Sequence, residues 1–104
     1  MYHFFVYAPI QNTKEIKDAM FNLGIGSLGK YSNCVWSTKG SGEFKPLDKA
    51  CPFIGTENQY SNVEEMKLEF FIPEGVNIID VITTLKLVHP YETPAYGIIK
   101  LDFH

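Results

Sequence analysis

The arrangement of hydrophobic and polar positions predicts the regular elements of this chain. Residues 2–8 are a dense run of aromatic and branched side chains closed by a proline, which is typical of a strand buried on both faces. Residues 63–72 alternate between apolar and mostly charged side chains, and this period of two predicts a strand with one apolar face. Further strands are expected at 33–39 and 96–103, and residues 43–45 could add a short one.

Two helices are expected where apolar residues recur at helical spacing. The first begins near Asn12, which precedes Glu15 in a pattern like a capping box, and it ends at Gly24. The second begins at Asn77 and ends at His89, because the proline that follows disfavours helix in the residue before it. Residues 40–60 contain glycines and prolines without a clear period. They are expected to form a long loop, which in a compact domain is usually functional or ordered by a partner.

The order strand, helix, strand, strand, helix, strand predicts an α+β fold of the ferredoxin-like type. Both helices would cover one face of a four-stranded antiparallel sheet, with the long loop between the second and third strands. The other face would carry the side of the first strand that holds Phe4 or the side that holds Phe5. It would also carry Glu65, Lys67 and Glu69. A partly aromatic face is unfavourable in water, so a homo-oligomer is expected to bury it, sheet against sheet.

Composition limits the classes of function. The chain has 104 residues, 45% of them hydrophobic and 20% charged, which predicts a single globular domain over residues 1–104. Its net charge is −3 and all of its basic residues are lysines, so nucleic acid is not an expected partner. No apolar stretch is long enough to span a membrane, so a membrane is not an expected partner either. With no long apolar run and no signal-peptide pattern, a cytoplasmic location is expected, where Cys34 and Cys51 would stay reduced.

The stretch Gly24-Ile25-Gly26-Ser27-Leu28-Gly29 matches the dinucleotide-binding fingerprint letter by letter. That fingerprint requires a strand before it and a helix opening at it, because the helix N-terminus holds the pyrophosphate. Here the expected order is reversed, with a helix before and a strand after. We therefore interpret the stretch as a helix C-cap followed by a flexible loop.

The stretch from His89 to Pro94 places an imidazole and the carboxylate of Glu92 three residues apart between two prolines. Such a pair could bind a metal ion or share a proton. The alternative is that His89 is favoured at the helix C-terminus by electrostatics and that the prolines only shape the turn. The residues alone leave these interpretations open.

Other reactive residues are weaker candidates. Cys34, in an expected strand, is interpreted as a small core residue, and its separation from Cys51 fits no zinc spacing. His3 and His104 lie near the two ends of the chain. Because the first and last strands can be neighbours in this fold, the two imidazoles could form a site together. The charged run 64–69 faces solvent, pairs with partner chains in an oligomer interface, or supplies paired carboxylates for acid catalysis.

Several motifs together resemble one family. They are Gly24-x-Gly26-x-x-Gly29-x-Tyr31-x-x-Cys34, Gly40-x-Gly42-x-Phe44-x-Pro46, Pro52-x-x-Gly55, Val63-x-Glu65-x-x-x-Glu69 and His89-Pro90-Tyr91-Glu92-x-Pro94-Ala95-Tyr96. Over residues 4–101 the chain is similar to the inserted domain of the Nif-three-like family, whose members are dinuclear-metal hexamers. That insert is in turn similar to the PII signalling proteins and to the divalent-cation-tolerance protein CutA.

The resemblance implies a PII/CutA-like domain and trimeric association. It places residues 40–60 where PII proteins have the loop that they use for partners and ligands. The chain is expected to be a stand-alone version of the insert. The family's metal ligands lie in the flanking main domain, so no metal ligand is carried over to this chain, and the resemblance supplies no reaction.

We therefore expect a non-enzymatic, oligomeric binding or regulatory module with its ligand in a cleft between subunits. The ligand would be a small molecule or a divalent metal ion, and its identity is left open. The predicted ligand-binding residues are Tyr31, Cys34, His89, Tyr91 and Glu92, with His89 and Glu92 as candidate metal ligands and no catalytic residue assigned. Two alternatives stay open: a small enzyme with His89 or Glu92 as acid or base and Cys34 as nucleophile, or a structural domain for a separately encoded protein.

Overall fold

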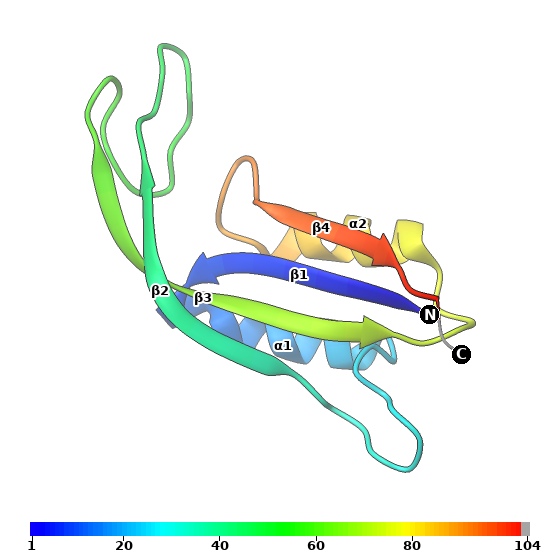
Figure 1. Ribbon diagram of the computed structural model, residues 1–104. Coiled ribbons are helices and arrows are strands. Elements are labelled where there is room, and N and C mark those ends of the chain that lie inside the picture. The colour runs from blue at the N-terminus through cyan, green and yellow to red at the C-terminus, as the bar shows by residue number, and fades with distance from the viewer. Residues whose placement is uncertain (103–104) are drawn as a thin grey trace.

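The computed structural model describes residues 1–102 and confirms the predicted ferredoxin-like plan (Figure 1). The sheet order is β2-β3-β1-β4, and each neighbouring pair is antiparallel. The elements are β1 (Tyr2–Pro9), η1 (Ile10–Asn12), α1 (Thr13–Asn22), β2 (Trp36–Phe44), β3 (Ser61–Ile72), α2 (Ile78–Val88) and β4 (Tyr96–Lys100).

Both helices lie on one face of the sheet, and the hydrophobic core fills the space between them and the strands (Figure 1). Phe4 of β1 stacks on Phe70 of β3 with ring centroids 5.7 Å apart, and Phe21 of α1 meets Phe70 edge-on. Burying each large apolar side chain contributes about 1.5–3 kcal/mol. The fully buried members are Phe4, Val6, Ala8, Ile16, Met20, Leu68, Ile72, Val81 and Leu85.

The face of the sheet that the helices leave open carries the other side of β1. In the β1–β3 register Phe5 lies opposite Glu69 and Tyr7 opposite Lys67, so these side chains share that face. The ammonium of Lys67 lies 3.6 Å from Glu69 and 5.3 Å from the centroid of the Phe5 ring. Trp36 of β2 pairs with Glu69 and is 68% exposed. Of the two alternatives for the first strand, the Phe5 side is therefore the open one.

The second strand differs from the prediction. It was expected at 33–39 but spans Trp36–Phe44. Residues 40–44 were expected in a loop, with a possible short strand at 43–45, but they continue the pairing with β3 as far as Phe44 opposite Ser61. The pattern Gly40-Ser41-Gly42 is typical of a turn, but the cross-strand hydrogen bonds with residues 61–65 override that local preference. The long loop is shorter than predicted, at 45–60, and the β2–β3 hairpin projects past the end of β1 (Figure 1).

The predicted helix ends are confirmed in part. Asn77 caps α2, because its side-chain oxygen accepts a hydrogen bond from the backbone N–H of Ile79 at 2.8 Å. Gly24 follows the last turn of α1 with a φ of +90°, as expected of a glycine after a helix. The capping box at Asn12 is wrong, since its side chain makes no cap and its oxygen is buried without a partner. A 3₁₀ turn precedes α1 there instead.

The last strand was predicted at 96–103 and ends at Lys100. Phe103 and His104, the latter a weak site candidate, lie outside the described residues. None of the helices within residues 1–102 is sufficiently long and apolar to cross a membrane.

Candidate functional site

The segment after α2, residues 89–95, is hydrogen-bonded to the end of β1. Beyond the last residue of β1 that pairs with β4, the backbone N–H of Tyr7 donates to the carbonyl of Ala95 at 3.1 Å. The carbonyl of Tyr7 accepts a 2.7 Å hydrogen bond from Nε2 of His89. Because both backbone groups of Tyr7 are used in this way, the loop 89–95 is held along the edge of β1 next to the base of the long hairpin.

His89 is a buried residue that shapes this loop. Its Nδ1 accepts a 3.0 Å hydrogen bond from the backbone N–H of Tyr91, and its Nε2 donates to the Tyr7 carbonyl. These partners fix a neutral ring with the proton on Nε2, because a carbonyl only accepts and an amide N–H only donates. Burial lowers the pKa of His89, against the smaller opposing effects of the Tyr7 carbonyl and the charge of Glu65.

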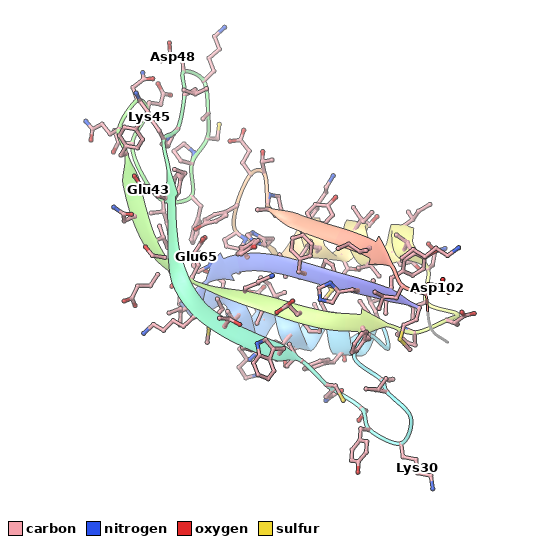
Figure 2. The ribbon with its side chains drawn as sticks, viewed as in Figure 1. Lys30, Glu43, Lys45, Asp48, Glu65 and Asp102 are labelled. Atoms are coloured by element: carbon pink, nitrogen blue, oxygen red, sulfur yellow. The ribbon has the colours of Figure 1, made fainter. Side chains whose placement is uncertain are left out.

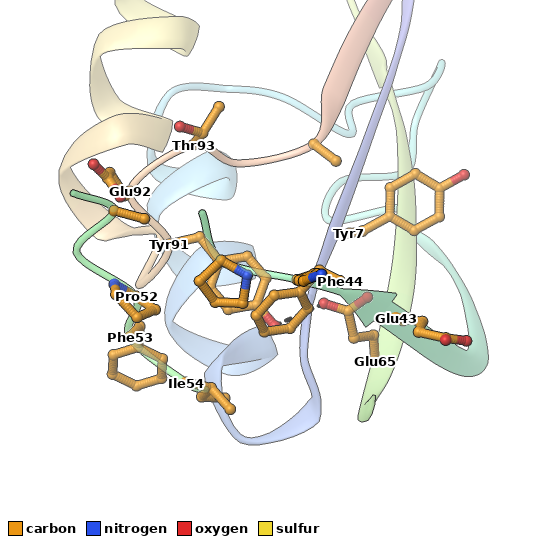
Figure 3. A pocket seen from close by; sticks show the side chains of 15 residues that line it. Tyr7, Glu43, Phe44, Pro52, Phe53, Ile54, Glu65, Tyr91, Glu92 and Thr93 are labelled. Carbon is orange, nitrogen blue, oxygen red and sulfur yellow. Dashed lines mark hydrogen bonds between the residues drawn. The ribbon is translucent and has the colours of Figure 1, made fainter. Parts of the chain in front are cut away.

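The hydroxyl of Tyr91 joins the loop to the sheet. It donates a 2.8 Å hydrogen bond to Oε2 of Glu65, a residue of β3 that pairs with Pro9 of β1 and Gly40 of β2 (Figure 3). Burial raises the pKa of Tyr91, and the hydrogen bond to the Glu65 carboxylate and its charge raise it further. Tyr91 therefore stays protonated and acts as a donor.

Gly42 of β2 makes room for the Glu65 carboxylate. It is the diagonal neighbour of Glu65 on the same face of the sheet, and a side chain at position 42 would collide with that carboxylate. Gly40, two residues before it, has no neighbour in the space that a side chain would fill. The two glycines of this strand therefore differ in their structural role.

Glu92 connects the loop 89–95 to the segment 45–60 between β2 and β3. Its Oε2 accepts a 2.9 Å hydrogen bond from the backbone N–H of Cys51. Cys51 is exposed and unpaired. Together with the bond between Tyr91 and Glu65, this bond links the segment 45–60 to β3 through the loop 89–95.

A cavity of about 330 Å³ lies between the hairpin and the loop (Figure 3). Its volume is at the lower end of the range for small-molecule sites. The rings of Phe44 and Phe53 lie 6.1 and 6.5 Å from that of Tyr91. Apolar side chains form most of the wall: Phe44, Pro46, Pro52, Phe53, Ile54 and Tyr91. Its charged lining residues are Glu43, Lys45, Glu65 and Glu92.

The predicted ligand-binding residues form two groups. Tyr91 and Glu92 line the cavity, and His89 supports the loop behind it. Tyr31 and Cys34 belong to the loop between α1 and β2, which leaves the sheet at the opposite end (Figure 1). Figure 2 shows Lys30, the neighbour of Tyr31, far from Glu65. Within one chain the structure therefore does not bring the two groups together.

Cys34 precedes β2 and does not lie within a strand as expected. Its backbone N–H donates to the carbonyl of Gly26 at 2.9 Å, and its thiol is half-buried and 3.9 Å from the carbonyl of Ser32. It lines a second cavity of about 400 Å³ on the open face with His3 and Trp36. In this second cavity Nε2 of His3 lies 3.1 Å from Oε1 of Glu69. The glycine-rich loop 24–29 follows a helix, as predicted.

Metal binding by His89 and Glu92 stays a prediction, and the geometry gives it no support. Both ring nitrogens of His89 already have backbone partners, so a metal ion would first have to displace one of them. Among residues 1–102 no three His, Cys, Asp or Glu side chains are grouped as metal ligands would be. The same two bonds leave His89 without a free nitrogen for proton transfer.

Sequence reasoning did not assign Glu65, Gly42 and Phe44 to a site. Glu65 was recognised as part of a charged strand, and all three residues as members of the motifs that carry the family resemblance. The available signal was the alternation of residues 63–72, which places Glu65 on the open face, together with the expected turn after His89. What was missing was the register of the β2–β3 hairpin, which sets Gly42 beside Glu65.

Comparison with solved structures defines the class of fold. CutA1 from Pyrococcus horikoshii matches all of this chain and 86% of its own with a TM-score of 0.69 at 15% identity, which is a likeness of fold. CutA from Archaeoglobus fulgidus matches with a TM-score of 0.68 at 15% identity. The chain thus has the CutA/PII-like form of the ferredoxin-like fold.

Closer relatives narrow this class. A Bacillus cereus protein related to NIF3 matches 98% of this chain with a TM-score of 0.80 and 31% identity, over 26% of its own length. The Bacillus subtilis protein named GTP cyclohydrolase 1 type 2 homolog is 40% identical over 93% of this chain, and the Halalkalibacterium halodurans protein of that name is 38% identical over 97%. No family model matches the sequence.

The chain is a homologue, over nearly its whole length, of a CutA-like segment of the NIF3-related proteins. The predicted resemblance is thereby confirmed. The chain spans about a quarter of the length of the curated relatives that it matches, 27% and 26% of the two above.

Proposed function

We propose that this domain is a non-enzymatic, self-associating binding module that holds a small molecule in the cavity between the β2–β3 hairpin and the loop 89–95. The observation that carries the proposal is the bond between Tyr91 and Glu65. It places a fixed polar pair in a cavity whose walls are mostly apolar. A few well-placed polar groups within an apolar lining are typical of small-molecule sites.

The way in which the cavity is built supports the same function. The loop is held by Tyr7 and Glu65 on one side and by Cys51 on the other, so its conformation is set before any ligand arrives. A site that is ordered in advance loses less conformational freedom on binding. His89 acts here as a positioning residue, because its ring fixes the backbone of Tyr91 and does not line the cavity.

Self-association is supported by the open face of the sheet. That face carries Phe5, Tyr7 and Trp36 beside the ion pair of Lys67 and Glu69, and helices cover only the opposite face. Covering an aromatic sheet face with a second copy removes apolar area from water. The resemblance to PII and CutA proteins favours a trimer. In such an assembly Tyr31 and Cys34 would reach the cavity only from a neighbouring copy.

A thermal-shift screen tests the proposal. The wild-type protein is screened with nucleotides, including the GTP that the name of the relatives mentions, with small organic molecules and with divalent cations. Compounds that stabilise the wild type should lose most of their effect on Tyr91→Phe and on Glu92→Gln, and keep it on the control Tyr60→Phe, whose hydroxyl is exposed. If every stabilising compound acts equally on all four proteins, the cavity is not the site.

A further inference from the structure

We propose that the ligand of this cavity is a small organic cation with a flat aromatic ring, its positive group held by Glu65. This inference rests on the proposed function, because it concerns the same cavity. Three observations lead to it: the charges of the lining, the free oxygen of Glu65 and the arrangement of the rings.

The lining is acidic. Two carboxylates, those of Glu65 and Glu92, lie at the loop 89–95, whereas Glu43 lies on the other face of β2 from Gly42 and Phe44 and points away from the rings (Figure 3). The ammonium of Lys45 lies 5.3 Å from the ring centroid of Tyr60, a residue that does not line the cavity. Among residues 1–102, the ion pairs of the neighbouring strand positions join Lys39 to Glu64 and Lys67 to Glu69, and none involves Glu65. The cavity therefore favours a cation and repels a phosphate.

Glu65 uses one carboxylate oxygen in a hydrogen bond, and within residues 1–102 the other oxygen makes none. Its Oε2 accepts from the Tyr91 hydroxyl, while Oε1 lies in the space beside Gly42 that the absent side chain leaves. A carboxylate accepts hydrogen bonds at both oxygens, and bonds from a charged donor are about twice as strong as neutral ones. The carboxylate is thus oriented by Tyr91 and can take a further N–H donor.

The rings favour a flat ligand. The rings of Phe44 and Tyr91 lie next to Glu65, and the ring of Phe53 lies farther from it on the other side of Tyr91 (Figure 3). All three are rigid groups that present a face or an edge. Aromatic faces attract both a stacked ring and a nearby positive charge. At about 330 Å³ the cavity suits a single-ring compound better than a nucleotide.

Three probes of nearly the same shape test the charge requirement: benzamidine, which is a cation at pH 7, neutral benzamide and anionic benzoate. Each is titrated into ¹⁵N-labelled protein, and shifts of the backbone amides of residues 42–54 and 91–95 are followed. Benzamidine should shift these amides and bind at least about tenfold more tightly than benzamide, which is the factor expected for a hydrogen bond to a charged group. Benzoate should have no effect on them.

Glu65→Gln removes the charge but keeps an oxygen for Tyr91, so benzamidine should bind it about tenfold more weakly than the wild type. The control is Glu64→Gln, the next residue along β3 on the opposite face, which should bind as the wild type does. The titrations separate the possible failures. If benzamide or benzoate binds these amides as well as benzamidine does, the cation is wrong and the cavity stands as a site. If none of the three probes shifts them, this inference is overturned, and the thermal-shift screen decides separately whether the cavity is a site.

Discussion

The hydroxyl of Tyr91 donates a 2.8 Å hydrogen bond to Oε2 of Glu65, and this bond joins the loop after α2 to the third strand of the sheet. The two residues are 26 positions apart in sequence. Glu65 also lies beside the hairpin through Gly42, and Tyr91 beside Phe44. One pair of side chains therefore fixes how the loop, the sheet and the hairpin meet around the cavity.

Replacing Tyr91 by phenylalanine removes the donor and leaves a half-buried carboxylate without its partner. We expect the free energy of unfolding to fall by about 1 kcal/mol, the usual worth of such a bond. Urea denaturation followed by circular dichroism measures it. The control Tyr60→Phe lacks only an exposed hydroxyl and should match the wild type, and an equal loss in both variants would contradict the role given to Tyr91.

The buried neutral ring of His89 predicts a pH dependence of stability. Its pKa is lowered in the folded state, so the unfolded chain binds a proton more readily as the pH falls below the ordinary value of about 6.5. The stability due to this ring is complete above that pH and is lost as the pH falls toward the folded pKa. Urea midpoints between pH 5 and pH 8 should show the decline in the wild type.

The variant His89→Gln isolates this effect. Glutamine can donate to the Tyr7 carbonyl but does not titrate. The variant should therefore be less stable than the wild type at pH 8, and its urea midpoint should change less between pH 5 and pH 7. A wild-type slope that survives in His89→Gln would assign the titration to another group.

The two glycines of β2 give a matched test of the space beside Glu65. Alanine at position 42 would meet the Glu65 carboxylate and push it away from Tyr91, whereas alanine at position 40 meets nothing. Gly40→Ala should be neutral or stabilising by up to about 1 kcal/mol, because alanine restricts the unfolded chain. Gly42→Ala should be less stable than Gly40→Ala by about 1 kcal/mol in urea denaturation. If the two variants were equally stable, the Glu65 carboxylate would be able to move aside without a loss of stability, contrary to this prediction.

The open sheet face predicts self-association that depends on Phe5. Its ring lies over Gly97 of β4 in the middle of that face, where a carboxylate would disfavour burial against another copy. Native mass spectrometry should give several copies for the wild type and a monomer for Phe5→Glu. Ile79→Glu, at an exposed position of α2, should assemble as the wild type does. A monomeric wild type would refute the association.

Particular residues show how far the sequence could predict this molecule. The alternation of residues 63–72 predicted β3, because a strand with one buried face leaves a period of two in the sequence. The dense aromatic run at 2–8 predicted β1, although only one side of that strand is buried in the core. Gly40 and Gly42 gave the opposite result, since two glycines are typical of a turn and only their pairing with β3 makes them a strand. Local patterns do not contain that pairing.

The site follows the same rule. The place of Tyr91 and Glu92 in one ordered polar loop could be predicted because prolines surround them, whereas ligand binding by these residues stays a prediction. Glu65 could not be placed with them, because the contact depends on the register of the hairpin and on how the chain turns after His89. Tyr31 and Cys34 share the glycine-rich character of functional loops, yet the antiparallel order of the strands places them at the other end of the sheet.

A fragment screen by ¹⁵N–¹H correlation spectroscopy on the wild-type protein tests the central claim most directly. The claim is that the cavity between the hairpin and the loop 89–95 is where this domain binds small molecules. Most fragments that bind should shift the amides of residues 42–54 and 91–95 and leave those of residues 24–35 unchanged. Fragments that gather instead on residues 24–35, or that shift amides evenly over the whole surface, would contradict it.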